Sequence, residues 1–148
     1  MEIGSYYVRR AIQIDASAHQ VWHEFQDARK FGAWFGVGHS LDLFEPVKGG
    51  RVELSIEDAG QIRGYGGQII VFDEATELSF ENNWFGNTPS KVPTFITFRL
   101  RSLYDGTHVE LFHHGFERLG KIAASEFVGY ESAWDLHHLV ELKRIVEK

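Results

Sequence analysis

The spacing of the apolar residues changes along this chain, and the change limits the folds that the chain can adopt. Between residues 40 and 115 apolar and polar residues alternate, as Val52, Leu54 and Ile56 do within residues 51–57. Such alternation is typical of strands with one face on a core and the other in water. From residue 123 to residue 146 the apolar residues recur at helical spacing. We therefore expect a sheet followed by one C-terminal helix, about 35 Å long at a rise of about 1.5 Å per residue.

Turn-forming residues divide the alternating region into strands. Gly49 and Gly50 turn the chain early in this region, and Asp105 with Gly106 is a strong hairpin signal. The predicted strands are residues 6–14, 41–45, 51–57, 61–72, 77–84, 94–103 and 107–115. Tight turns between successive strands predict an antiparallel meander, and the C-terminal helix is the element long enough to cover its apolar face.

Two short helices are expected between the first strand and the rest of the sheet. Ser17 is a good N-cap, and Gln20 three residues later completes a capping box. Asp27 can cap the second helix. Trp22 and Phe25 are expected in the core. The predicted fold class is α+β: a curved antiparallel sheet of about seven strands wrapped around a long C-terminal helix, with two short helices after the first strand.

Composition narrows the classes of function. The 148 residues contain no linker or repeat, so residues 1–148 are expected to form a single domain. The absence of cysteine excludes disulfides and thiol catalysis, and it suits a cytoplasmic location. The net charge is −6 with no cluster of Lys and Arg, so nucleic acid is not an expected partner. No stretch approaches the roughly 20 apolar residues of a membrane span, and residues 1–10 lack the apolar core of a signal peptide.

A twisted sheet that grips one helix leaves a gap where the two diverge, and a ligand would lie in that gap. Five polar residues fall in apolar phase: Arg10, Asn82 and His113 on strands, and Glu131 and His138 on the helix, with Trp134 between the last two. We expect the side chains of Asn82, His113, Glu131 and His138 to face one enclosed space. Trp34 and Phe35 are expected near its mouth. The predicted ligand-binding residues are Trp34, Phe35, Asn82, Trp84, His113, Glu131, Trp134 and His138.

Other interpretations of these polar residues stay open. They could form a structural network, for example between Arg10 and Glu131, because a buried charge needs a partner. Glu131 and His138 could also act as general acid and base. The neighbouring pairs at residues 113–114 and 137–138 cannot easily chelate one ion, because adjacent side chains diverge on a strand and on a helix. With no nucleophile elbow and no phosphate loop, we assign no catalytic residue and expect no metal or cofactor.

Several stretches of the chain resemble a known superfamily. They are residues 12–22 (IQIDASAHQVW), 34–36, 106–116 (GTHVELFHHGF) and 129–142. Their order and spacing resemble the helix-grip superfamily of START-like and polyketide-cyclase-like domains, and most closely the branch similar to the heat-shock-protein ATPase activator. The chain departs at Ala133 and Trp134, where such proteins often have Gly-Trp. The resemblance implies a cavity between sheet and helix, and no universal catalytic residue.

The favoured function is the binding of a small lipophilic molecule in this cavity. The resemblance also implies two alternatives: a protein-interaction module similar to a co-chaperone, and a cyclase- or hydrolase-like enzyme that uses the same cavity. A cavity filled by Trp and Phe side chains would favour the interaction module, for which Leu136 and Val140 would offer a small apolar surface to a protein partner. An open cavity with Glu131 and His138 within hydrogen-bond reach would favour the enzyme.

Overall fold

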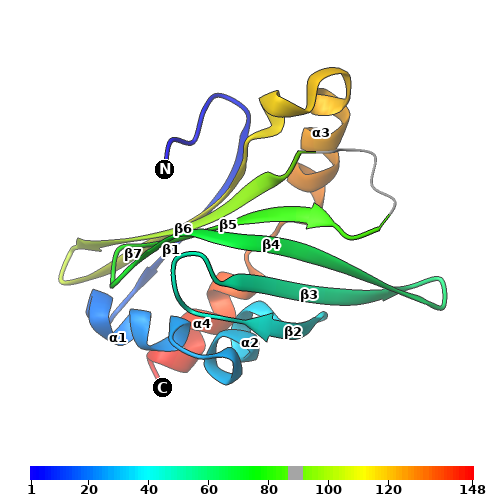
Figure 1. The fold of residues 1–148 in the computed structure, drawn as a ribbon. Coiled ribbons are helices and arrows are strands. Elements are labelled where there is room, and N and C mark those ends of the chain that lie inside the picture. The colour runs from blue at the N-terminus through cyan, green and yellow to red at the C-terminus, as the bar shows by residue number, and fades with distance from the viewer. Residues whose placement is uncertain (87–91) are drawn as a thin grey trace.

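Seven antiparallel strands form one sheet in the computed structural model of this chain, which describes residues 1–86 and 92–148 (Figure 1). The strands are β1 (Tyr7–Ile14), β2 (Ser40–Phe44), β3 (Arg51–Asp58), β4 (Gln61–Asp73), β5 (Glu77–Trp84), β6 (Thr94–Leu103) and β7 (Gly106–His114). Their order in the sheet is β1-β7-β6-β5-β4-β3-β2. Strands β2 to β7 thus follow one another as the predicted meander. β1 pairs with β7 and forms one edge of the sheet.

The helices lie mainly on one side of this sheet (Figure 1). They are α1 (Ala18–Trp22), η1 (His23–Phe25), α2 (Ala28–Phe35), η2 (Phe116–Ile122), α3 (Ala123–Ala133) and α4 (His137–Val146). The predicted capping box is present at α1, where the Gln20 amide N–H donates to Ser17 Oγ at 3.2 Å and the Ser17 amide N–H donates to the Gln20 side chain at 2.8 Å. Asp27 caps α2 by accepting from the Lys30 amide. These caps confirm both short helices.

The predicted C-terminal helical region is present, but it consists of two helices, α3 and α4. Trp134 has an extended backbone, with φ −75° and ψ 130°, so the helix ends there. The Arg10 guanidinium donates to the carbonyls of Glu131 and Trp134, each at 3.0 Å, and so satisfies groups that the break leaves without helical partners. Asp135 accepts from the His137 amide at 2.8 Å and starts α4. The apolar spacing did not show this break because both helices keep an apolar face toward the sheet.

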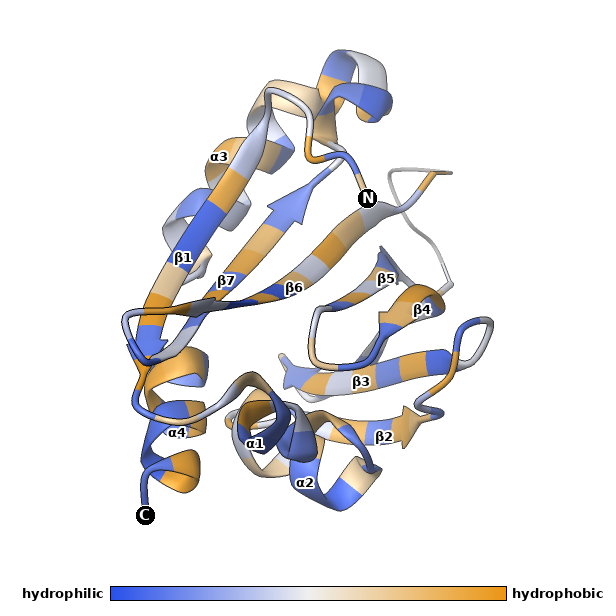
Figure 2. Ribbon diagram, turned by 90° about the vertical axis from the view of Figure 1, so that its left-hand side faces the viewer, coloured by the Kyte–Doolittle hydropathy of each residue, from blue (hydrophilic) through white to orange (hydrophobic). Residues whose placement is uncertain are grey.

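β4 bends where its glycines lie, and the bend lets the sheet curve around the helices (Figure 2). Gly66 has a φ of +132°, and a Cβ atom at this position would lie 2.0 Å from the Val52 carbonyl oxygen of β3. The register between β4 and β5 also shifts between Ile69 and Val71. Only glycine combines this backbone angle with such a close approach between strands.

Aromatic side chains of α1, η1 and α2 fill the space between these helices and the sheet. Phe25 is fully buried and stacks on Trp22 with the ring centroids 5.0 Å apart. It also contacts Phe31, Trp34 and the sheet residue Phe98, with centroids 5.0 to 6.0 Å apart. Trp22 and Phe25 are therefore core residues, as predicted. This cluster fixes α2 against the sheet.

A polar network is buried on the face of the sheet opposite the aromatic cluster. His113 and His114 are adjacent on β7 and point to opposite faces, as alternation requires. His114 Nε2 lies 2.8 Å from Thr97 Oγ1, which lies 2.9 Å from Ser79 Oγ. The Ser79 hydroxyl donates to the Glu77 carboxylate at 2.8 Å. The face of the central strands opposite the aromatic cluster therefore carries buried, hydrogen-bonded polar residues.

The substitution Phe25→Ala is expected to lower the free energy of unfolding by about 3–5 kcal/mol, because it empties the centre of the aromatic cluster. Urea denaturation of the variant and the wild-type protein measures this difference. The matched control is Val128→Ala on the exposed side of α3, which should change stability by no more than about 0.5 kcal/mol. An unchanged denaturation midpoint for Phe25→Ala would show that this packing is not what holds α2 in place.

Candidate functional site

A cavity of about 330 Å³ lies between the sheet and the helices, around the break between α3 and α4. Its walls come from the end of α2 and the loop after it, from strands β3 to β7, and from α3 and α4. The residues that line it are Phe35, His39, Ile56, Tyr65, Asn82, Trp84, Ile96, His113, Tyr130, Ala133, Trp134, His137 and His138. Of these, His39, Ala133 and His137 are exposed, which places the mouth of the cavity beside them. Most of the lining is aromatic or aliphatic.

Six of the eight predicted site residues line this cavity: Phe35, Asn82, Trp84, His113, Trp134 and His138. They come from α2, β5, β7 and the α3–α4 region, so residues far apart in the sequence meet at one place.

Two predicted residues lie elsewhere. Trp34 is fully buried in the aromatic core, where its indole N–H donates to the Glu24 carbonyl at 3.1 Å, because α2 turns this side chain away from the mouth. Glu131 is exposed, and only its backbone carbonyl takes part in the structure, through Arg10. Its angular position was predicted for one continuous helix, whereas the inner side of the shorter helix α3 presents Tyr130. The expectation that Glu131 faces the enclosed space is therefore wrong.

Tyr130 is the main residue that the sequence analysis missed. It lies three residues after Phe127 and four before Trp134, which is the spacing of one helix face, and this spacing could have identified it. Tyr65 was missed as well, because residues around it were assigned only to a glycine-rich strand. Both phenols reach the cavity from opposite walls, β4 and α3.

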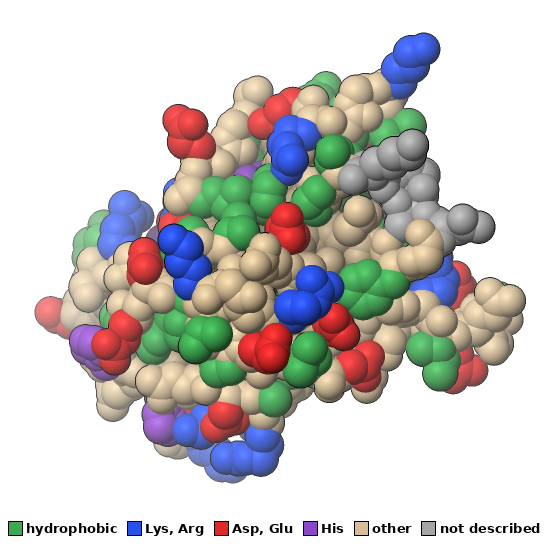
Figure 3. All heavy atoms as spheres, in the orientation of Figure 1, with side chains coloured by type: hydrophobic (Ala, Val, Ile, Leu, Met, Phe, Trp, Pro, Cys, Tyr) green, Lys and Arg blue, Asp and Glu red, His purple; other side chains and the backbone are tan. Residues whose placement is uncertain are grey.

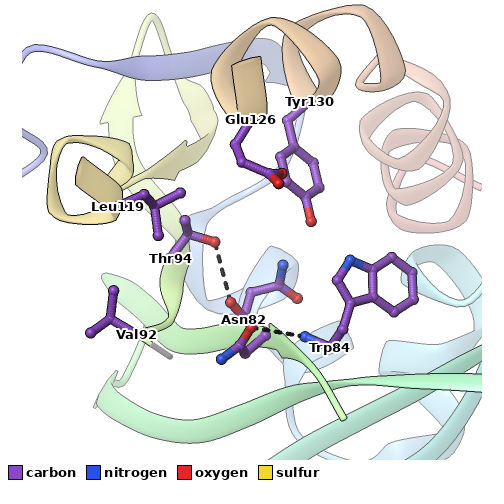
Figure 4. Close-up of a pocket in the computed structure, with 8 residues that line it drawn as sticks. Asn82, Trp84, Val92, Thr94, Leu119, Glu126 and Tyr130 are labelled. Carbon is purple, nitrogen blue, oxygen red and sulfur yellow. Dashed lines mark hydrogen bonds between the residues drawn. The ribbon is translucent and has the colours of Figure 1, made fainter. Parts of the chain in front are cut away.

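His113 is the centre of a hydrogen-bond network that occupies both of its nitrogens. The Trp134 indole N–H donates to His113 Nδ1 at 2.9 Å, so Nδ1 carries no proton. The ring proton is therefore on Nε2, which donates to Thr94 Oγ1 at 2.7 Å. The Thr94 hydroxyl donates to the Asn82 carbonyl at 3.2 Å (Figure 4). Burial, with a smaller contribution from His114, lowers the pKa of His113 to about 3. This histidine is neutral and holds the wall of the cavity together.

His138 is also a neutral wall residue. Its Nδ1 lies 3.2 Å from the Trp34 carbonyl oxygen, and Nδ1 must carry the proton because a carbonyl only accepts. The ring packs between Phe35 and Trp134, with centroids 5.1 and 5.7 Å away. Burial lowers the pKa of His138 to about 4, although the hydrogen bond to Trp34 opposes the shift. Since Glu131 lies outside the cavity, the predicted acid–base pair of Glu131 and His138 is not assembled.

Asn82, Trp84 and Tyr130 form a polar corner of the cavity, and the same three residues also line a smaller pocket beside it, which Figure 4 shows. The Tyr130 hydroxyl points toward Asn82 in this view. Asn82 is only 6% exposed, and its Oδ1 has no hydrogen-bond partner among the described residues. Burial, and then Glu126, raises the pKa of Tyr130, while hydrogen bonds from Trp84 and Asn82 to its hydroxyl oppose the rise. A buried amide oxygen without a partner costs about 1–3 kcal/mol, so the polar corner is a place where a bound molecule could add a favourable contact.

A smaller cavity of about 30 Å³ adjoins the polar corner. Its volume corresponds to about one water molecule, so it is too small for an organic ligand. Its walls also include Asn83, Val92, Thr94, Leu119 and Glu126.

The mouth of the large cavity is held by a pair of hydrogen-bonded rings. The Tyr65 hydroxyl and His39 Nδ1 form a hydrogen bond, and burial raises the pKa of Tyr65. Burial, and then the nearby His137, lowers the pKa of His39. His137 in turn bonds Asp135 with 2.5 Å between Nδ1 and Oδ1. These contacts tie the loop after α2 to the wall formed by β4.

The described residues contain no group of three or more His, Asp or Glu placed to hold a metal ion. No helix of the described residues is long and apolar enough to cross a membrane. On the face shown in Figure 3, acidic and basic side chains are interspersed. The cavity of about 330 Å³ brings together aromatic side chains and a buried carboxamide from distant parts of the chain, and the functional hypothesis is built on it.

Residues 15–147 match the family described as Activator of Hsp90 ATPase homolog 1-like protein. The chain belongs to this family. None of the curated proteins compared with the chain matches it. The match confirms the helix-grip resemblance and the branch within it that the sequence motifs indicated.

Solved structures show the same fold. MLL2253 from Mesorhizobium loti has a TM-score of 0.72 and 19% identity over 95% of this chain and 96% of its own. DynU16, from the dynemicin biosynthetic locus, has a TM-score of 0.68 and 18% identity over 98% of this chain, which spans about half the length (48%) of DynU16. The Aha1 dimer from Colwellia psychrerythraea has a TM-score of 0.59 and 16% identity over 97% of each chain. At these identities the likeness extends to the fold alone.

The free energy of unfolding is expected to fall as the pH is lowered from about 7.5 to about 5. In this window the histidines of the unfolded chain take up protons below about pH 6.5. His113 and His138 stay neutral in the folded protein until about pH 3 and pH 4. The unfolded state therefore binds more protons, and each such histidine lowers stability by about 2 kcal/mol at about pH 5.

Urea denaturation at several pH values measures this dependence. In His138→Gln the decline over the same window should be smaller by about 2 kcal/mol, because the variant lacks one of the groups that protonate only on unfolding. A wild-type stability that does not change over this window would contradict the neutral, buried state of these histidines.

Proposed function

We propose that this protein binds a small lipophilic molecule in the cavity between the sheet and the α3–α4 region. The observation that carries the proposal is an aromatic-lined cavity of about 330 Å³ whose wall includes the buried carboxamide of Asn82, with an Oδ1 that has no hydrogen-bond partner among the described residues. Ligand pockets are typically about 300–1,000 Å³, mostly apolar, with a few polar groups that fix orientation. This cavity has that composition and lies at the small end of the range.

Hydrogen bonds between protein groups hold the cavity walls in place, which supports binding further. Arg10, Trp134, His113 and Thr94 are joined by hydrogen bonds that fix the helices against the sheet. A preformed site costs less conformational entropy on binding than one that must be ordered. The aromatic core under α2 supports the wall that carries Phe35.

The two alternatives have less support from the geometry. The enzyme alternative depended on Glu131 and His138 lying within reach of each other, and Glu131 is exposed. The interaction alternative was favoured by a cavity filled with Trp and Phe, whereas open volume remains beside Trp84 and Trp134. Leu136 and Val140 are exposed, as two isolated apolar side chains commonly are.

Fluorescence of the uncharged probe N-phenyl-1-naphthylamine tests the proposal. Its emission should increase on addition of the protein, because the probe passes from water into an apolar site. The variant Ala133→Phe places a large ring at the exposed mouth and should weaken probe binding by at least about tenfold.

The matched control is Ala124→Phe, since Ala124 is exposed on the same helix and does not line the cavity. It should bind the probe as the wild-type protein does. A probe that fails to bind the wild-type protein, or one that binds Ala133→Phe equally well, would show that the cavity is not the binding site.

A further inference from the structure

The described residues that line the cavity include no acidic side chain and neither Lys nor Arg. Its titratable members are histidines and tyrosines. His113 is fixed in a neutral form by hydrogen bonds on both nitrogens, and His138 donates its Nδ1 proton to a carbonyl. Burial raises the pKa of Tyr65 and Tyr130, so both phenols keep their protons. The enclosed part of the described lining is therefore polar in places and uncharged, while His137, at the exposed mouth, is paired with Asp135.

A charged group bound in such an interior would lose its hydration without gaining an oppositely charged partner. Arg63 packs its guanidinium over the Trp84 ring at 4.2 Å, but Arg63 is exposed and does not line the cavity. Asp135 lies near the mouth, where its carboxylate is engaged by His137. Among the described lining residues, a bound carboxylate or ammonium group would thus find no oppositely charged side chain to offset its lost hydration.

The polar corner does offer compensation to an uncharged polar group. The Asn82 side chain is more than nine-tenths buried, and its Oδ1 has no partner among the described residues. Oδ1 is enclosed, and rotation of the carboxamide about its last torsion, which is broad and nearly two-fold, exchanges oxygen and nitrogen. A hydroxyl both donates and accepts, so it can pair with either end of this carboxamide. An ether, in contrast, can only accept.

The cavity volume limits the size of the molecule. An apolar protein cavity of about 150 Å³ accommodates benzene. A cavity of about 330 Å³ therefore suits a molecule of about two fused rings with a small substituent.

We propose that the cavity selects an uncharged, hydroxylated molecule of about two rings, whose hydroxyl pairs with Asn82, and that it rejects a carboxylate of the same shape. This inference rests on the proposed function, because it specifies the ligand of the same cavity.

Displacement of N-phenyl-1-naphthylamine by three naphthalene derivatives at neutral pH tests the inference. They are 2-naphthol, 2-methoxynaphthalene and 2-naphthoate, which share the two rings and differ in the polar group. 2-Naphthol should displace the probe at about tenfold lower concentration than 2-methoxynaphthalene, because its hydroxyl can donate to Oδ1 or accept from Nδ2 of Asn82, whereas the ether can only accept. 2-Naphthoate should be weaker than 2-naphthol by at least about 100-fold, because its charge must be desolvated.

The variant Asn82→Leu keeps the approximate volume of the side chain and removes the carboxamide. It should bind the probe, and the advantage of 2-naphthol over 2-methoxynaphthalene should disappear. The matched control is Asn83→Leu, because residue 83 follows on the same strand and does not line the large cavity. This control should keep the tenfold preference. Probe binding shows in each case that the variant is folded.

The outcomes separate the inference from the proposed function. A probe that does not bind the wild-type protein overturns both. A probe that binds and is displaced equally well by 2-naphthol and 2-naphthoate overturns the selection for uncharged ligands and leaves the binding function standing. Equal displacement by 2-naphthol and 2-methoxynaphthalene, or a preference that persists in Asn82→Leu, overturns the role of the hydroxyl and of Asn82.

Discussion

One chain of hydrogen bonds connects the helix break to the sheet, and the cavity depends on it. Arg10 on β1 donates to the Trp134 carbonyl at the end of α3. The Trp134 indole N–H donates to His113 on β7, and His113 donates to the Thr94 hydroxyl on β6. The Thr94 hydroxyl in turn donates to the Asn82 backbone carbonyl on β5. Four strands and the junction of two helices are thereby held in one arrangement. Each donor and acceptor along this chain has a partner, which is the condition for burying polar groups at little cost.

This arrangement explains why similar polar residues have different roles. His113 uses both nitrogens within the network, so it is structural, which is the interpretation that the sequence analysis kept open for these residues. Asn82 contributes its backbone carbonyl to the same network, while its side-chain oxygen remains without a partner among the described residues. The network thus gives the polar groups in the cavity wall hydrogen-bond partners, while Oδ1 of Asn82 has none among the described residues. We regard that difference as the main physical distinction between supporting and binding residues in this protein.

The aromatic core and the cavity are two parts of one space between sheet and helices. η1 and α2 fill their part with Phe25, Phe31 and Trp34, whose ring centroids are within about 6 Å of one another. Around the break at Trp134, side chains leave a cavity of about 330 Å³ open. Residues on both sides of the break line this cavity, among them Tyr130 of α3 and His138 of α4.

The sequence alone determined the elements that follow from local chemistry. Alternation identified the strands, Ser17, Gln20 and Asp27 identified the starts of α1 and α2, and the motifs pointed to the correct family. These signals are readable because backbone periodicity and capping involve residues close together in the chain. Most of the predicted cavity residues were found for the same reason.

Only the tertiary structure decided where the C-terminal helical region breaks, and with it the positions of Glu131 and Tyr130. The break has no glycine or proline to mark it, and it is stabilised by Arg10, which lies more than 120 residues earlier in the sequence. The volume of the cavity and the unpartnered oxygen of Asn82 likewise result from how several elements pack. Such features depend on contacts between distant residues, and no local pattern in the sequence records them.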